Sequence, residues 1–496
     1  MKYIVINPGD SVLVALENLK KGETVMDFAL SEDIPAGHKA SIREIRKGEK
    51  VIKYGYPIGS ATRDIHKGCL VDHSCLETGL GGMEEYTYTP APDTLSVSAL
   101  PVERSTFRGF RRRNGSVGVR NQIWIIPTVG CVNGIAQTLS ARFREEIRGN
   151  MGSVDAVVAF THNYGCSQLG EDHRNTQKIL ADLVCHPNAG GVLIVSLGCE
   201  NNQLSSFLEV VGDVDPARVK TMTVQQVEGD EIEYGLGLLR DICRECSADR
   251  REVVPVSELK VGLKCGGSDG LSGITANPLL GVVSDWIAAN GGTTVLTEVP
   301  EMFGAETLLM NRCRDRAVFE KTVSLINGFK RYYLANGQPV YENPSPGNKA
   351  GGISTLEEKS LGCTQKSGSS IVNDVVEYGG RLKEKGLNLL GAPGNDLVAS
   401  TALAAAGCQM VLFTTGRGTP FGCPVPTVKI STNSPLASRK PSWIDYNAGV
   451  IAEGASMDSV AADFVKFILD VAEGRSVNNE VNGWSEIAVF KSGVTL

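Results

Sequence analysis

The sequence lacks several features that would assign it to a common class of protein. No G-x-x-x-x-G-K-[ST] phosphate loop occurs, and no G-x-G-x-x-G opens a helix after the first strand. These absences argue against a P-loop nucleotidase and a classical dinucleotide enzyme. Only six histidines are present, and aromatic residues make up 6% of the chain.

Long apolar runs and an excess of basic charge are also lacking. No stretch approaches the roughly 18–20 apolar residues of a membrane helix, and the start MKYIVINPGD does not resemble a secretion signal. The net charge is -7, which argues against nucleic-acid or anionic-membrane partners. Thirteen cysteines without a secretion signal indicate free thiols or metal ligands in a reducing cytoplasm.

The length of 496 residues predicts several domains, and the pattern changes along the chain. Short β-branched runs alternate with Lys-Gly turns over residues 1–85, which predicts a small all-β domain. Residues 86–105 are rich in Pro, Ser and Thr and read as a linker. Apolar strands then alternate with helical stretches, so we expect an α/β region with mainly parallel sheets, divided into residues 106–252 and 253–496.

Glycines gather where the predicted strands of the α/β region end. Examples are CGGSDG after Lys264, GAPGND after Leu390 and TGRGTPFG after Thr414. Ligands of open α/β sheets bind at the carboxyl ends of strands, and glycine lets backbone N–H groups approach an anion closely. These loops therefore predict a site for a carboxylate or phosphate. Arg417 lies between two glycines, so we favour a ligand contact over a surface ion pair.

Several of the same loops carry one thiol each. The cysteines concerned are Cys131, Cys166, Cys199, Cys265, Cys363 and Cys423. Their spacings match no standard zinc ribbon, and packing remains as good an explanation as a metal site. His162, Cys166 and Glu171 share one glycine loop, and imidazole, thiolate and carboxylate together suit a first-row divalent ion such as Fe²⁺.

Ten stretches in their order along the chain resemble the altronate/galactarate dehydratase family, the sugar-acid hydro-lyases. They are IPAGHK, VIKYGYPIG, GFRRRNGSVGVRN, THNYGCSQLGEDHRNT, HPNAGGVLIVSLGCENN, KCGGSDGLSGITANPLLG, EVPEMFGAE, NPSPGNKAGGISTLEEKSLGC, GAPGNDLVAST and TTGRGTPFGCPVPTVKISTN. The resemblance covers essentially the whole chain. It implies an N-terminal β-clip (SAF) domain and an α/β catalytic region that dehydrates a sugar acid to a 2-keto-3-deoxy acid.

The resemblance also implies a divalent metal, Fe²⁺ first and Mn²⁺ second. It implies a small-molecule sugar acid as partner. The sequence leaves the oligomeric state open, a homodimer included. With the chemistry of such an elimination in mind, we assign candidate roles to thirteen residues. They are His38 and His162 as acid/base residues; Cys166, Cys199, Glu200 and Cys265 around the metal; and Arg120, Asn121, Ser268, Asp269, Lys366, Arg417 and Asn433 as substrate contacts.

One departure from the family pattern bears on the substrate. Where the family commonly shows Val-His-x-His-Asn, this chain has Val71-Asp72-His73-Ser74-Cys75. Three alternatives therefore stay open beside the hydro-lyase. They are a sulfo-lyase acting on sulfolactate, an iron–sulfur hydro-lyase with three thiols among Cys131, Cys166, Cys199, Cys265 and Cys363, and a sugar-acid binding protein without turnover.

Overall fold

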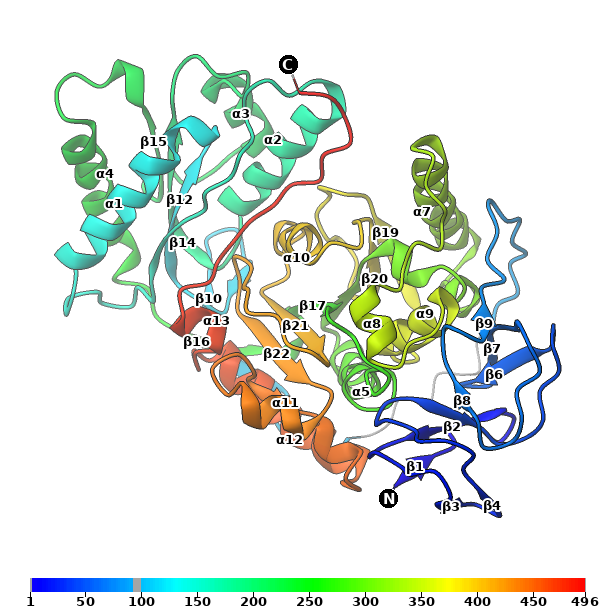
Figure 1. The fold of residues 1–496 in the computed structure, drawn as a ribbon. Coiled ribbons are helices and arrows are strands. Elements are labelled where there is room, and N and C mark those ends of the chain that lie inside the picture. The colour runs from blue at the N-terminus through cyan, green and yellow to red at the C-terminus, as the bar shows by residue number, and fades with distance from the viewer. Residues whose placement is uncertain (1, 92–99, 496) are drawn as a thin grey trace.

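The computed structural model describes residues 2–91 and 100–495, and it begins with a small all-β unit (Figure 1). Its predicted Lys-Gly turns are present, with Gly22, Gly48 and Gly68 at φ of 82°, 81° and 85°, a conformation that favours glycine. The all-β prediction is confirmed. The strands are β1 (Tyr3–Ile4), β2 (Val12–Ala15), β5 (Lys39–Ser41) and β8 (Leu70–Val71) in one sheet, β3 (Thr24–Val25) and β4 (Phe28–Ala29) in a second, and β6 (Lys50–Lys53), β7 (Tyr56–Ala61) and β9 (Leu76–Glu77) in a third.

The predicted linker, residues 86–105, lies partly outside the described residues, because it includes residues 92–99. Its first described part is anchored on the α/β region. The Tyr86 hydroxyl donates to Glu306 Oε1 at 2.6 Å, and the Tyr88 hydroxyl donates to the Cys313 carbonyl at 2.8 Å.

A four-stranded parallel sheet follows, in the order β13-β12-β14-β15. We call it the middle sheet. Because β12 comes first in the chain and β13 and β14 lie on opposite sides of it, the topological switch point lies at β12. Its elements are β12 (Gln122–Pro127), α1 (Asn133–Glu146), β13 (Val157–Ala159), α2 (Gly170–Val184), β14 (Ala189–Ser196), α3 (Leu204–Val211), β15 (Val219–Thr223) and α4 (Glu231–Cys246); β10 (Thr106–Arg111), β11 (Val117–Gly118) and β16 (Glu252–Pro255) form a separate antiparallel sheet.

The last part of the chain builds a seven-stranded, all-parallel sheet in the order β19-β20-β18-β17-β21-β22-β23. Its strands are β17 (Lys260–Cys265), β18 (Thr293–Leu296), β19 (Val372–Val376), β20 (Gly386–Leu390), β21 (Met410–Thr415), β22 (Thr427–Ser431) and β23 (Tyr446–Asn447). Its helices are α5 (Ala276–Ala289), α6 (Glu306–Met310), α7 (Arg316–Ala335), α8 (Pro346–Ala350), α9 (Leu356–Thr364), α10 (Asp396–Ala405), α11 (Ser434–Arg439), α12 (Met457–Ala472) and α13 (Asn478–Val481). The prediction of mainly parallel sheets is confirmed.

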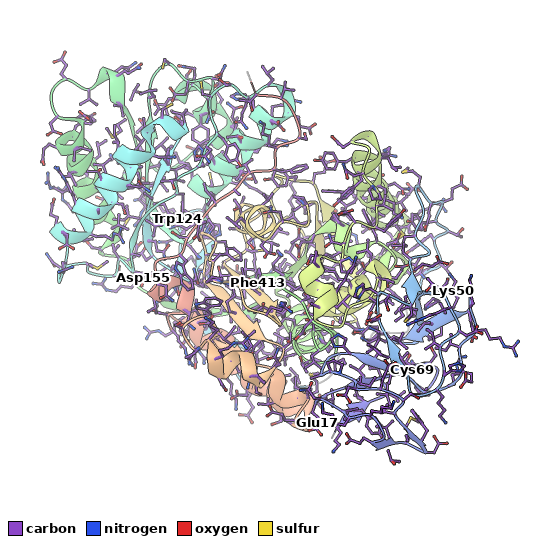
Figure 2. All side chains as sticks on the ribbon, in the orientation of Figure 1. Glu17, Lys50, Cys69, Trp124, Asp155 and Phe413 are labelled. Carbon is purple, nitrogen blue, oxygen red and sulfur yellow. The ribbon has the colours of Figure 1, made fainter. Side chains whose placement is uncertain are left out.

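The two parallel sheets share one hydrophobic core, to which α2 and α10 both contribute. Trp124 of β12 and Phe413 of β21 belong to it, and Figure 2 places them in the two sheets. The C-terminal segment runs between the two units and ends near α2 (Figure 1), where Asp172 accepts from the backbone N–H groups of Ser492 and Gly493. Within the described part of the chain, no helix has the length and apolar character needed to cross a membrane. The domain boundaries at 85, 105 and 252 stay predictions.

Candidate functional site

The seven-stranded sheet has its topological switch point beside β17. The chain goes from β17 to β18, β19 and β20 on one side and then returns to β21 on the other. Ligands of open α/β sheets bind in the crevice outside the carboxyl ends at such a point. Cys265 is the last residue of β17, and Arg417 is the second residue after the end of β21. The predicted loops CGGSDG and TGRGTPFG therefore lie side by side, and Arg417 N donates to the Gly267 carbonyl at 3.0 Å.

Two buried thiols meet at this crevice. Cys265 Sγ lies 3.4 Å from Cys363 Sγ, which belongs to α9, and both side chains are buried. The Lys366 ammonium, just after α9, donates to Cys265 Sγ at 2.8 Å. The hydrogen bond from Cys363 and the nearby lysine charges outweigh burial and lower the pKa of Cys265 to about 7, whereas donation to Cys265 and burial raise the pKa of Cys363 well above its usual value. The pKa values of the two thiols are thus shifted in opposite directions.

Two buried glutamates stand beside the thiols, on the turn that follows β18. Glu301 Oε2 lies 3.2 Å from Cys265 Sγ, and Glu301 Oε1 lies 2.9 Å from Lys359 Nζ. Burial opposes ionisation of Glu301, but three neighbouring lysines outweigh it and hold the pKa of this carboxyl far below its usual range. The chain at Glu298 is in the left-handed region, at φ 67°, which a non-glycine residue rarely adopts.

Glu298 is the member of this pair whose pKa is raised. Its Oε1 accepts from Lys264 at 2.7 Å, and its buried Oε2 has no hydrogen-bond partner among the described residues. Burial and the charge of Glu301 raise the pKa of Glu298 well above its usual value. Lys264 also contacts Asp396 at 2.6 Å, and Asp396 carries the compensating negative charge.

Asp269 organises the loops around the crevice. It is held by the hydroxyls of Ser272 and Thr432 and by Asn433 Nδ2, which donates to Asp269 Oδ2 at 3.1 Å. Burial raises the pKa of Asp269, and these donors oppose the rise. Ser268 is buried, and its carbonyl accepts from Asn348. The predicted residues Ser268, Asp269 and Asn433 are therefore brought together, with Asn433 also capping α11.

The N-terminal β unit docks beside the same site through a buried charge cluster. Glu358 of α9 accepts from Lys39 Nζ at 2.9 Å and from Lys53 Nζ at 2.8 Å, and all three side chains are at most 1% exposed. The Gly37–His38 turn packs on the backbone of residues 351–352. His38 is half-buried, and burial lowers its pKa. Asp72 forms a tight turn with Ser74, which donates to Asp72 Oδ1 at 2.8 Å.

Replacement of Glu358 by glutamine should destabilise the docked β unit. The substitution leaves two buried ammonium groups without a carboxylate, so we expect the free energy of the first unfolding transition in urea to fall by about 3–5 kcal/mol. The matched control is Glu49→Gln, which removes an exposed pair with Arg43 and should cost less than about 1 kcal/mol. Equal effects of the two substitutions would contradict the docking role.

Glu358 also predicts an acid sensitivity. Burial would raise the pKa of Glu358, but Lys39 and Lys53 outweigh it and lower the pKa to about 2. A carboxyl whose pKa is lower in the folded protein than in the unfolded chain stabilises the fold at pH values above the unfolded pKa of 4.5. This contribution is lost as the pH falls from 4.5 through about 2.

The site is closed in this structure. A cavity of about 10 Å³, enough for one water molecule, adjoins Asp269, Glu358, Lys359 and Cys363. Arg417 and Asn395 are exposed at the surface beside the crevice, and Asp396 is 31% exposed. Residues 345–352 adjoin Arg417, since a Cβ on Gly347 would lie 3.9 Å from Arg417 Nε.

Cys265, Glu301 and Cys363 are also the one His/Cys/Asp/Glu group within the described residues whose ligand atoms all lie within 4.8 Å of one another. Thiolate and carboxylate donors suit iron by type, although two thiols are poor ligands for Mn²⁺. However, Lys366 already contacts the thiolate and Lys359 the carboxylate. A divalent cation would add charge to a cluster that these ammonium groups already compensate, so the residues as arranged do not fit Fe²⁺ or Mn²⁺.

The other predicted metal residues and the predicted acid/base residue His162 lie on the middle sheet, not beside Cys265. Cys166 and Cys199 are exposed after β13 and β14. Glu200 is buried and accepts from Thr128 Oγ1 at 2.6 Å. Burial raises its pKa, but this bond and backbone donors outweigh burial and lower it. His162 is buried, with Nε2 2.8 Å from the Pro127 carbonyl.

Arg120 and Asn121 have structural partners at the opposite, amino end of β12. Arg120 makes a two-pronged contact with Glu480, at 2.6 and 2.8 Å, and its remaining nitrogen donates to backbone carbonyls. Asn121 donates to Ser153 and to the Cys246 carbonyl. We therefore leave both out of the proposed substrate site.

From the stretch EVPEMFGAE, the sequence indicates that Glu298 and Glu301 are close enough to share a site, or that they pair with Lys or Arg. It gives no role to Lys264 or Lys359. The lysine partners of the two glutamates come from β17 and α9, so the sequence offered no local sign of the pairing.

The whole chain is similar to known proteins. Three family models match it: the altronate/galactarate dehydratase SAF domain over residues 1–79, the D-galactarate dehydratase/altronate hydrolase second domain over 109–247, and the D-galactarate/altronate dehydratase C-terminal domain over 256–495. The chain is 55% identical to altronate dehydratase of Bacillus subtilis (strain 168), over all of this chain and 99% of that protein. It is 55% identical to altronate dehydratase of Escherichia coli (strain K12) over the full length of both chains, and 33% identical to galactarate dehydratase (L-threo-forming) of E. coli K12 over 98% and 96% of the two.

Proposed function

This chain belongs to the altronate/galactarate dehydratase family, and we propose that altronate is the sugar acid it dehydrates, at the carboxyl end of β17. It is a hydro-lyase, a carbon–oxygen lyase that removes water from a sugar acid. The observation that carries the choice of altronate is the 55% identity over the whole chain to two altronate dehydratases, against 33% to the galactarate enzyme.

The first chemical requirement is a base for the proton on the carbon next to the carboxylate. We assign this role to the Cys265 thiolate, whose pKa of about 7 leaves a large thiolate fraction at neutral pH. When the proton moves to Cys265 Sγ, the substrate carboxylate becomes a dianionic enediolate. Lys366 donates to Cys265 Sγ and Lys359 pairs with the neighbouring Glu301, and both ammonium groups supply fixed positive charge near this intermediate.

The second requirement is an acid for the departing β-hydroxyl. We assign this role to Glu298, because its raised pKa favours the protonated carboxyl and its buried Oε2 has no hydrogen-bond partner among the described residues. Glu298 donates the proton as the C3–O bond breaks. Water leaves, and the resulting enol becomes a 2-keto-3-deoxy acid. Pairs of titratable groups whose pKa values are pushed apart are typical of acid/base sites, and both the cysteine pair and the glutamate pair show this here.

The remaining predicted residues have positioning roles in this proposal. Arg417 at the entrance suits the substrate carboxylate or a distal hydroxyl on approach. Asp269 and Asn433 hold the β17 and β21 loops together. A metal requirement stays part of the proposal because the family resemblance implies one, but no step is assigned to a metal at Cys265.

A substrate panel tests the proposal. Purified protein is incubated without oxygen with altronate, galactarate and sulfolactate, and the 2-keto acid and sulfite formed are measured. We expect kcat/KM for altronate to exceed that for galactarate by roughly tenfold or more, with no sulfite from sulfolactate. If kcat/KM is higher for galactarate than for altronate, galactarate is the substrate instead. Sulfite release would favour the sulfo-lyase alternative, and tight binding of altronate without product would favour the binding protein.

A further inference from the structure

The exposed thiols of this chain occur in one place. Of its thirteen cysteines, ten are buried or half-buried, and three are exposed: Cys131, Cys166 and Cys199. Free cysteine is among the most buried residue types, so exposure is unusual. These three thiols have no part in the elimination proposed at β17.

The three cysteines follow three adjacent parallel strands. Cys131 lies after β12, Cys166 after β13 and Cys199 after β14, and β13 and β14 flank β12. The carboxyl ends of parallel strands meet at one edge, and β12 marks the switch point of the middle sheet, where ligands of α/β sheets bind. This edge is a second ligand position, separate from that of β17.

Hydrogen bonds fasten the three loops to one another. The Gly130 N–H donates to the Tyr164 carbonyl at 2.9 Å, which joins the Cys131 and Cys166 loops. The Asn202 N–H donates to the Gly165 carbonyl at 2.9 Å, which joins the Cys166 and Cys199 loops. A Cβ on Gly165 would lie 2.1 Å from the Thr128 carbonyl oxygen, so only glycine permits this close approach.

The residue after Cys166 is held in an unfavourable conformation. Ser167 has φ 59°, in the left-handed region, and its N–H donates to Asn201 Oδ1 at 2.8 Å. The buried Oδ1 of Asn202, in the Cys199 loop, has no hydrogen-bond partner among the described residues. A loop that keeps a thiol exposed against backbone strain is typical of a binding site.

The spacing of the thiols excludes a single ion and suits a larger centre. Three thiolates on one tetrahedral ion with bonds of about 2.3 Å lie about 3.8 Å apart. The three cysteines do not form a group within 4.8 Å of one another anywhere in the part of the chain that the structure describes. The loops leave strands that lie about 4.8 Å apart. A cubane cluster carries its cysteines on different iron atoms, so it takes thiolates that lie farther apart than the ligands of a single ion.

We propose that Cys131, Cys166 and Cys199 bind a [4Fe–4S] cluster through three of its irons. The three loops bring no fourth cysteine, so the remaining iron is open to water or to an oxygen ligand. A cleft of about 940 Å³ includes Glu171 and Asn175 of α2, the helix that begins four residues after Cys166.

Reconstitution of the full chain tests the proposal. Protein purified without oxygen is incubated with ferrous iron and sulfide, desalted, and analysed for iron, sulfide and visible absorption. We expect about four irons and four sulfides per chain and a brown colour in the wild-type protein. Cys131→Ser, Cys166→Ser and Cys199→Ser should each lose most of both. Cys69→Ser, at a half-buried thiol of the β unit, and Cys265→Ser should keep both.

Several outcomes would overturn the proposal. They are iron bound without sulfide, iron retained by the three variants, and iron lost in Cys265→Ser alone, which would place the metal at β17. Because the three thiols are exposed, their serine variants should fold, and circular dichroism with the thermal midpoint checks this. Iron and sulfide contents test the cluster proposal independently of turnover. The cluster proposal would therefore stand even if altronate proved not to be the substrate.

Discussion

Replacement of Cys265 by serine should lower kcat/KM for altronate by about 10³-fold, because it removes the proposed base. A serine hydroxyl is far less acidic than this thiol and stays protonated throughout the working pH range. Lys366 would lose its anionic partner, since it donates to Cys265 Sγ at 2.8 Å. Initial rates of 2-keto acid formation over a range of altronate concentrations would measure the effect, which should fall mainly on kcat.

The pH profile separates a base from a residue that only packs. With a Cys265 pKa of about 7, kcat/KM should rise about tenfold per pH unit below 7 and level off above it. Cys363→Ser is the matched control, since its hydroxyl can still donate to the Cys265 thiolate, and the profile should move little. Cys363→Ala removes that donor and should move the rise to higher pH. Full activity in Cys265→Ser, or a profile that does not respond to Cys363→Ala, would remove Cys265 from this role.

The fold could be predicted from the sequence where its signals are local. Alternation of apolar strands with helical stretches placed β17 at 260–264, one residue short of its end at Cys265. Lys-Gly turns identified the N-terminal β unit for the same reason. The stretch 306–336 is largely helical and divides into α6 and α7. Asp315 starts the second helix by accepting from the Val318 N–H at 2.9 Å, a capping signal that was present in the sequence.

The site was predictable only in part, because its residues are far apart in the chain. Strand-end glycine loops indicated Cys265, Asp269 and Arg417, which lie at neighbouring strand ends. The pairing of Lys359 with Glu301 depends on how α9 packs on the turn after β18, and no local pattern encodes that contact. The sequence also could not show which of the two parallel sheets each thiol loop joins, so Cys166 and Cys199 were grouped with Cys265.

Arg120 shows why residue type alone misleads. A basic residue next to Asn121 at the start of a strand resembles an anion contact in sequence. In the fold it lies at the amino end of β12, where it pairs with Glu480 from a segment 360 residues away. An arginine that fills a buried structural role and one that binds substrate have the same local sequence signature.

Replacement of Glu298 by glutamine should lower kcat for altronate about 10²-fold or more while leaving the protein as stable as before. The amide keeps the shape and the neutral charge of a protonated carboxyl, and it can still accept from Lys264. It has no acidic proton to give to the departing hydroxyl. Because Asp396 carries the charge that compensates Lys264, we expect the free energy of unfolding to change by less than about 1 kcal/mol.

Glu301→Gln is the informative contrast, because Glu301 is the ionised member of the pair. Removing its charge leaves Lys359 buried without a carboxylate, so we expect a loss of about 3–5 kcal/mol in the free energy of unfolding, measured in urea beside Glu298→Gln. The two isosteric changes, at carboxyls three residues apart, should thus have opposite consequences: Glu298→Gln affects turnover and Glu301→Gln affects stability. If Glu298→Gln destabilises the protein as much as Glu301→Gln does, Glu298 is ionised in the folded state and cannot be the acid that protonates the leaving hydroxyl.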